Sequence, residues 1–181
     1  GIAVGSLLQA LTSLAMVVSG QELHRVVFWL MGGFVGATWS EVLNVLPYLG
    51  VGMVPAYVFS RELNLLLLGD ESARHLGTEV EKVKFILLVC ASLMTAAAVS
   101  VSGVIGFVGL IIPHSVRLVV GPDHRVLVPA AGLVGAIFLV LADTLARTAG
   151  GAMEIPVGVI TALCGAPFFI YLLRRERRLG F

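Results

Sequence analysis

The longest stretch without charge, residues 85–113, most constrains the fold of this chain. Its 29 consecutive residues include no Asp, Glu, Lys, Arg or His. About 20 apolar residues are enough to cross a bilayer as a helix. Residues 1–21, 42–60, 126–142 and 157–173 also lack charge. Only 13% of the chain is charged, against about 25% in soluble domains, and the mean hydropathy is +1.00. These runs predict a membrane protein rather than a soluble helical one.

The uncharged runs predict an all-α, polytopic membrane helix bundle with six spans. We place these spans at about residues 2–18, 42–60, 83–102, 107–120, 126–142 and 157–173. The fourth span is expected to be short and partly irregular, because it and the stretch before it contain Gly103, Gly106, Gly109 and Pro113. Irregular backbone at membrane depth occurs only where protein covers it or where it lines a water-filled cavity. This segment therefore indicates either a substrate pathway or tight packing between helices.

Residues 21–31 are too short for a span and have charge at one end. Phe28 and Trp29 stand near the other end, and Trp favours the membrane–water interface. We expect a short helix that lies at the membrane surface, ended by Gly32 and Gly33.

Residues 61–84 form the one long polar segment. The chain carries 12 Lys and Arg and 11 Asp and Glu, and nine of these 23 lie in this segment: Arg61, Glu62, Asp70, Glu71, Arg74, Glu79, Glu81, Lys82 and Lys84. A large aqueous surface between two spans predicts contact with a soluble partner. The net charge of +1 gives no indication of nucleic acid binding.

Basic residues predict the orientation in the membrane. With six alternating spans, residues 61–84, 121–125 and the C-terminus fall on one side. Ten Lys and Arg lie there, including Arg117 just before the turn at 121–125, whereas Arg25 and Arg147 lie on the other side. Positive charge is enriched in cytoplasmic loops, so we expect the polar segment and the C-terminus to be cytoplasmic.

Motifs for catalysis or metal binding are absent from the sequence. There is no Gly-x-x-x-x-Gly-Lys phosphate loop, no Cys/His metal spacing, and the four histidines are scattered. We therefore expect no nucleotide hydrolysis by this chain, no cofactor and no metal site. Asp143 is the acid most deeply placed in the membrane, with Arg147 four residues later in the favourable order. Asp143 either forms an interfacial ion pair with Arg147 or is a functional intramembrane group. Glu154 either caps the last span or faces the outer surface.

Six ordered sequence blocks closely resemble the permease subunits of ABC importers for iron-siderophores, haem and vitamin B12, the FecCD/BtuC type. They are LNLLLLGDESARHLG (63–77), GVIGFVGLIIPHSVR (103–117), DHR (123–125), ADTLAR (142–147), EIPVG (154–158) and GAPFF (165–169). Members of this family have ten spans, and this chain resembles them from about the fifth span onward. The chain opens in an apolar run without an initiator Met, which is typical of a fragment. We expect residues 1–181 to form one transmembrane permease domain.

The resemblance implies partners and roles for particular residues. It implies a permease dimer in the plasma membrane, with the substrate passing along the dimer axis, and cytoplasmic ATPase subunits that dock on residues 61–84. The core of this coupling loop is Gly69, Asp70, Glu71, Ala73, Arg74, Leu76 and Gly77. By position, residues 21–31 correspond to an outer gate helix, next to Ser19 and Gly20. An external substrate-binding protein would contact Glu22, Arg25 and Glu154.

Two other functional classes remain open from the sequence. The first is a secondary transporter in which Asp143 carries a proton, because such transporters also use broken helices. The second is a membrane scaffold that transports nothing. The resemblance favours an ATP-driven importer for a metal chelate. No residue indicates which chelate is carried.

Overall fold

The computed structural model describes residues 2–18, 23–149 and 155–178, and no strand occurs among them. The helices are α1 (Ile2–Val18), α2 (Leu23–Met31), α3 (Trp39–Val58), α4 (Ser60–Leu66), α5 (Asp70–His75), α6 (Val80–Ser102), α7 (Val108–Val120), α8 (His124–Ala149) and α9 (Val157–Arg178). The all-α fold class predicted from the uncharged runs is confirmed.

Each of the six predicted spans corresponds to a helix. Among the described residues, α3, α6 and α8 are long and apolar enough to cross a membrane. The other three predicted spans correspond to shorter apolar helices, Ala3–Leu14, Val108–Val120 and Val157–Leu172. The 13 residues of α7 agree with the short fourth span, because α6 stops at Gly103, whose φ of +65° is unfavourable for a residue with a side chain.

The helix that contains the predicted fifth span extends beyond residue 142, where the uncharged run ends. Helix α8 continues to Ala149. Asp143 and Arg147 stand one turn apart and form an i,i+4 ion pair along the helix, which supports the helical conformation. The end of the uncharged run therefore does not mark the end of the helix.

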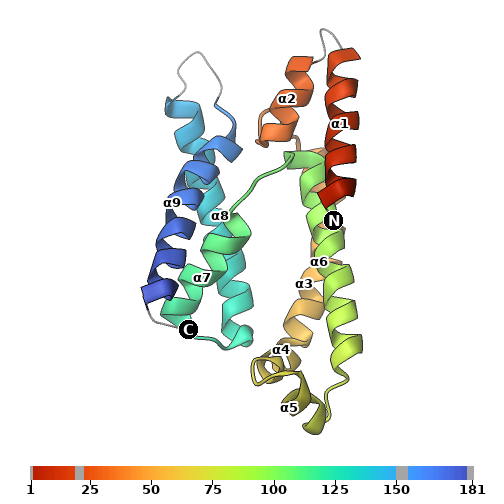
Figure 1. Ribbon diagram of the computed structural model, residues 1–181, viewed down its shortest axis with the longest axis vertical. Coiled ribbons are helices and arrows are strands. Elements are labelled where there is room, and N and C mark those ends of the chain that lie inside the picture. The colour runs from red at the N-terminus through yellow and green to blue at the C-terminus, as the bar shows by residue number, and fades with distance from the viewer. Residues whose placement is uncertain (1, 19–22, 150–154, 179–181) are drawn as a thin grey trace.

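The helices form two groups joined by residues 103–107. Helix α3 packs against α6, and α7 packs against both α8 and α9. Helices α4 and α5 lie at one end of the molecule, together with the turn before α8, whereas α2 lies at the opposite end (Figure 1). The polar segment thus extends beyond the apolar helices at one end only.

Only a small core is buried. One cluster consists of Ile112, Val116 and Leu127, and another of Ala142, Ala146 and Val157. Large apolar side chains on the outer faces of the helices stay exposed, including Leu133 at 70% and Val140 at 66%. Exposed apolar surface on this scale requires a bilayer or further protein to cover it.

Three glycines allow the two helix groups to meet at the α2 end, and we call them the glycine crossing: Gly32, Gly103 and Gly158. Gly32 and Gly103 have φ values of +67° and +65°. A Cβ atom on Gly103 would lie 2.0 Å from the carbonyl oxygen of Trp29, and one on Gly158 would lie 2.0 Å from that of Met31. The backbones touch here, so no side chain fits between them.

Backbone hydrogen bonds hold the same region together. Gly33 N donates to Ser102 O at 2.8 Å, and Gly158 N donates to Gly32 O at 3.3 Å. The turn that follows α2 is therefore attached to the end of α6 and to the start of α9. Trp29 before this turn and Trp39 after it are 47% and 82% exposed.

Candidate functional site

The polar segment folds into two short helices, and a glycine turns the chain between them. Gly69 is the residue before α5 and has φ +96° and ψ +154°. This region of backbone space is essentially accessible to glycine alone. The sequence Leu68-Gly69-Asp70 therefore changes direction sharply between α4 and α5.

A second glycine ends α5. Gly77 has φ +85°, its N–H donates to Arg74 O at 3.0 Å, and the N–H of Thr78 donates to Ala73 O at 3.0 Å. This pair of bonds is the Schellman motif, which satisfies the last carbonyls of a helix. Both ends of α5 are thus set by the backbone conformations of Gly69 and Gly77.

One side of α5 is anchored to the protein through small residues. Ala73 has no exposed surface, and Thr78 and Val80 are 9% and 2% exposed. Asp70, Glu71 and the other residues of α5 are exposed. The helix therefore rests on Ala73 and presents its polar side to solvent.

Charged residues link α5 to the start of α6. Arg74 Nη2 lies 2.8 Å from Glu81 Oε1, and Lys84 Nζ pairs with the Asp70 carboxylate. All four side chains are about half exposed or more. Exposed pairs of this kind contribute about 0–1 kcal/mol each. The charges keep the surface hydrated and leave the positioning of α5 mainly to the glycines and Ala73.

Three leucines are exposed beside these charges. Leu67 and Leu68 lie between α4 and α5, and Leu76 directly follows α5; they are 51%, 63% and 58% exposed. Apolar anchors surrounded by polar residues are the usual composition of a protein–protein contact. This surface suits a protein partner better than a small ligand.

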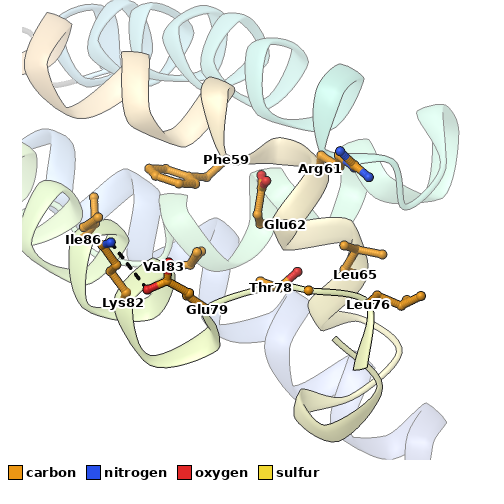
Figure 2. Close-up of a pocket in the computed structure, with 11 residues that line it drawn as sticks. Phe59, Arg61, Glu62, Leu65, Leu76, Thr78, Glu79, Lys82, Val83 and Ile86 are labelled. Carbon is orange, nitrogen blue, oxygen red and sulfur yellow. Dashed lines mark ion pairs between the residues drawn. The ribbon is translucent and has the colours of Figure 1, made fainter. Parts of the chain in front are cut away.

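A pocket of about 340 Å³ opens beside α5. Figure 2 shows Phe59 and Glu62 on one wall and the start of α6 on the other, where Lys82 pairs with Glu79 at 3.4 Å. The lining residues are Phe59, Arg61, Glu62, Leu65, Leu76, Gly77, Thr78, Glu79, Lys82, Val83 and Ile86. A pocket of this size, with apolar walls and a charged rim, can accept a side chain of a docked protein.

A polar contact joins α4 to α8, and sequence reasoning missed it. Asn64 Nδ2 donates to Asp123 Oδ1 at 2.6 Å, and the N–H of His124 donates to Asn64 Oδ1 at 2.8 Å. The backbone N–H of Arg125, and next the Asn64 amide, hold the pKa of Asp123 below its usual value. The only signal in the sequence is a polar residue at 64 inside an otherwise apolar run, residues 63–68.

The predicted membrane ion pair, Asp143 and Arg147, lies on the C-terminal part of α8. Arg147 Nε is 2.8 Å from Asp143 Oδ2, and Arg147 Nη2 is 3.4 Å from the carbonyl oxygen of Phe34. A pocket of about 270 Å³ adjoins this pair. Arg25 belongs to α2, where only the backbone is described. Ser19, Gly20, Glu22 and Glu154 lie outside the described residues.

Among the described residues, no three His, Cys, Asp or Glu side chains gather as a metal site would require. Cys90 and Cys164 are both free thiols on helices α6 and α9. The candidate site consists of α5, the three exposed leucines and the adjacent pocket.

Comparison with known proteins identifies similar chains. Residues 1–175 match the FecCD transport family. The cobalamin import system permease protein BtuC of Halobacterium salinarum is 55% identical over 179 residues, covering 98% of this chain and 48% of that protein. The hemin transport system permease protein HmuU of Yersinia pestis is 44% identical over 182 residues, covering 98% and 53%.

A solved structure has the same fold. It is an inward-facing conformation of an ABC transporter assigned to the metal-chelate type, with a TM-score of 0.87 and 36% identity over 97% of this chain and 57% of that chain. The chain spans about half the length of the curated relatives that it matches.

Proposed function

The chain belongs to the FecCD transport family, and on this premise we propose that it forms the pathway-containing transmembrane subunit of an ATP-binding-cassette importer. It is a multi-pass protein of the plasma membrane. The energy source is a pair of ATPase subunits, because this chain has no phosphate-binding loop of its own. The cargo is a metal chelate of the iron-siderophore, haem or cobalamin class.

The observation that carries this proposal is the construction of α5. A six-residue helix with glycine-determined ends and exposed leucines beside it suits a groove on a soluble partner. We infer that ATPase subunits bind α5 and residues 61–84 on the cytoplasmic side, where the C-terminus also lies. When ATP closes the ATPase pair, α5 is displaced as a rigid unit and the spans rock between outward-open and inward-open states. The subunit acts mechanically and not catalytically.

The opposite end of the molecule is proposed to receive the cargo. Helix α2 would act as the outer gate, with Ser19 and Gly20 where the gate narrows. An external or lipid-anchored substrate-binding protein would dock through Glu22, Arg25 and Glu154. A second permease copy would complete the pathway along the dimer axis.

The names of the relatives support the cargo class. They include permeases for cobalamin, hemin and, in Bacillus subtilis, iron(3+)-hydroxamate. These cargoes are all large metal complexes that differ in chemistry. Direct uptake of radiolabelled iron or cobalt chelates, measured in vesicles that hold the complete protein with its ATPase, tests the class as a whole.

Reversing the charge of Arg74 is expected to uncouple ATP hydrolysis from uptake. Arg74 is 59% exposed and lies in the centre of the proposed contact. Arg74→Glu would place a carboxylate where the ATPase meets a cation, and charge reversal at an interface typically costs several kcal/mol. We expect uptake per ATP hydrolysed to fall about tenfold or more, with the permease still folded.

A charge exchange separates this effect from the loss of the internal ion pair with Glu81. Arg74→Glu combined with Glu81→Arg restores that pair but not the contact with the partner. We expect the double variant to stay uncoupled. Unchanged uptake by Arg74→Glu would contradict the proposed contact, and recovery in the double variant would assign the effect to the internal pair.

Asp143 is expected to matter little for transport. It lies near the end of α8 and bonds to Arg147, and an Asn side chain still accepts that hydrogen bond. We expect Asp143→Asn to change ATP-dependent uptake by less than about twofold, since exposed helix pairs are worth only about 0.3–0.5 kcal/mol. Loss of uptake by this variant, with dependence on a proton gradient instead of ATP, would favour a secondary transporter.

A further inference from the structure

We propose that Asn64 is a positioning residue that fixes the polar segment to α8, so that α8 transmits the displacement of α5 to the opposite end of the molecule. This inference rests on the proposed function and deepens it. It names the helix through which the motion of a docked ATPase would reach the outer side.

The geometry gives Asn64 three contacts in one place. Its Nδ2 donates to Asp123 Oδ1 at 2.6 Å, its Oδ1 accepts the backbone N–H of His124 at 2.8 Å, and the same oxygen lies 2.8 Å from His124 Nδ1. An amide has two donor hydrogens and one acceptor oxygen with two lone pairs. Both ends of the amide are therefore engaged with residues about 60 positions later in the chain.

The contact reaches the first turn of a rigid helix. Asp123 Oδ1 also accepts the N–H of Arg125 at 3.0 Å, which is the side-chain cap that starts α8. Helix α4 packs against α8 in the same region. A movement of α4 therefore moves the N-terminal end of α8 directly.

The other links from the polar segment are weaker. The ion pairs of α5 with the start of α6 are exposed, with side chains between 47% and 82% accessible, and such pairs hold little energy. Asn64 and His124 are partly buried, where hydrogen bonds are less weakened by water. Of the described contacts beyond the direct chain connection, the one through Asn64 is best suited to carry force.

The far end of α8 meets the turn after α2. Helix α8 has 26 residues and so spans about 39 Å at 1.5 Å per residue. At its C-terminal end, Arg147 Nη2 lies 3.4 Å from Phe34 O, and Ala142 and Ala146 are buried with Val157 and Phe34 packed in the same cluster. Displacement of α8 would be felt at residues 32–38, which connect α2 to α3.

The test exchanges the side chains of Asn64 and Asp123 between the two positions. In the complete protein, Asn64→Asp sets two carboxylates against each other. The double variant Asn64→Asp with Asp123→Asn restores one donor and one acceptor to the pair and keeps an oxygen for the N–H of Arg125. Uptake of a radiolabelled chelate and ATP hydrolysis are measured in vesicles, and their ratio is taken per assembled complex.

We expect Asn64→Asp to lower the ratio of cargo imported to ATP hydrolysed by about tenfold, as for the loss of a hydrogen bond to a charged group, and the double variant to recover to within about twofold. A purely structural role would reduce the amount of complex but not this ratio. Asn64→Ala, which removes the contact without adding charge, should lower the ratio as well, and it serves if Asn64→Asp does not assemble. Thr95→Val, which removes a hydroxyl that bonds only to Ala91 O within α6 and lies outside the polar segment, is the control and should leave the ratio unchanged.

Two outcomes would overturn the inference: an unchanged ratio in Asn64→Asp and Asn64→Ala, or a double variant as low as Asn64→Asp. Either outcome can be interpreted only if the wild-type complex retains its ATPase and imports cargo. Wild type that does neither would contradict the proposed function itself, so the two failures are distinguishable.

Discussion

Replacing residues 70–76 by a flexible Gly-Ser linker of equal length should abolish retention of the ATPase subunits by the permease. The replacement removes the helix between Gly69 and Gly77, the buried anchor Ala73 and the exposed Leu76. Loss of a single central anchor typically weakens an interface by about 2 kcal/mol or more, roughly thirtyfold, and here several are lost together. Co-purification of the complete permease with its ATPase in detergent measures the effect.

The control for this replacement lies at the start of α3, away from α5. Glu41→Gln removes a charge there, and the Gln side chain can still accept the backbone N–H of Thr38. This variant leaves α5 unchanged and should retain the ATPase. A folded permease that keeps its ATPase after the linker replacement would place the coupling contact elsewhere. Wild type that folds but never retains an ATPase would favour the gradient-driven alternative.

Changing Gly103 to Ala should prevent the chain from folding normally. A Cβ atom there would lie 2.0 Å from Trp29 O, which is backbone and cannot rotate away, and the φ of +65° adds strain. Strained φ values cost about 1–3 kcal/mol and overpacking about 1–3 kcal/mol more, which is a large part of the stability of a typical domain. We expect little monodisperse protein by size-exclusion chromatography and a clearly lower thermal midpoint.

Gly106→Ala is the matched control, because it changes the same connection between α6 and α7. A Cβ atom on Gly106 would meet nothing within 4 Å, so this variant should behave nearly as wild type. If Gly103→Ala were as well folded as Gly106→Ala, close backbone contact at the glycine crossing would be excluded.

The positions of the helices could be predicted from the sequence because lipid imposes a local requirement. A span needs a continuous apolar run, and such runs are read directly from composition along the chain. Helix α1 begins and ends at residues 2 and 18, as predicted. The end of α8 cannot be read from the uncharged run, because charge is excluded only from the hydrocarbon and the helix continues through Arg147.

The candidate site could be predicted only in part. The charges of residues 61–84 indicated an aqueous surface, and the resemblance implied a coupling loop with Gly69 to Gly77 at its core. The pairing of Asn64 with Asp123 could not be predicted, because it joins positions 59 apart and depends on how α4 packs against α8. The glycine crossing could not be predicted for the same reason, because three segments that are far apart in the sequence meet there. In the sequence, each glycine alone looks like an ordinary small residue.

The two tryptophans of this chain make its intrinsic fluorescence a probe of one end of the molecule. Trp29 and Trp39 stand on either side of the turn after α2, and both residues are partly or largely exposed. Neither is near α5. Intrinsic fluorescence from these two rings therefore reports on the polarity around the α2 end alone, and it does so without any label. An emission change when nucleotide binds at the other end would be a direct spectroscopic record of long-range communication through the helices.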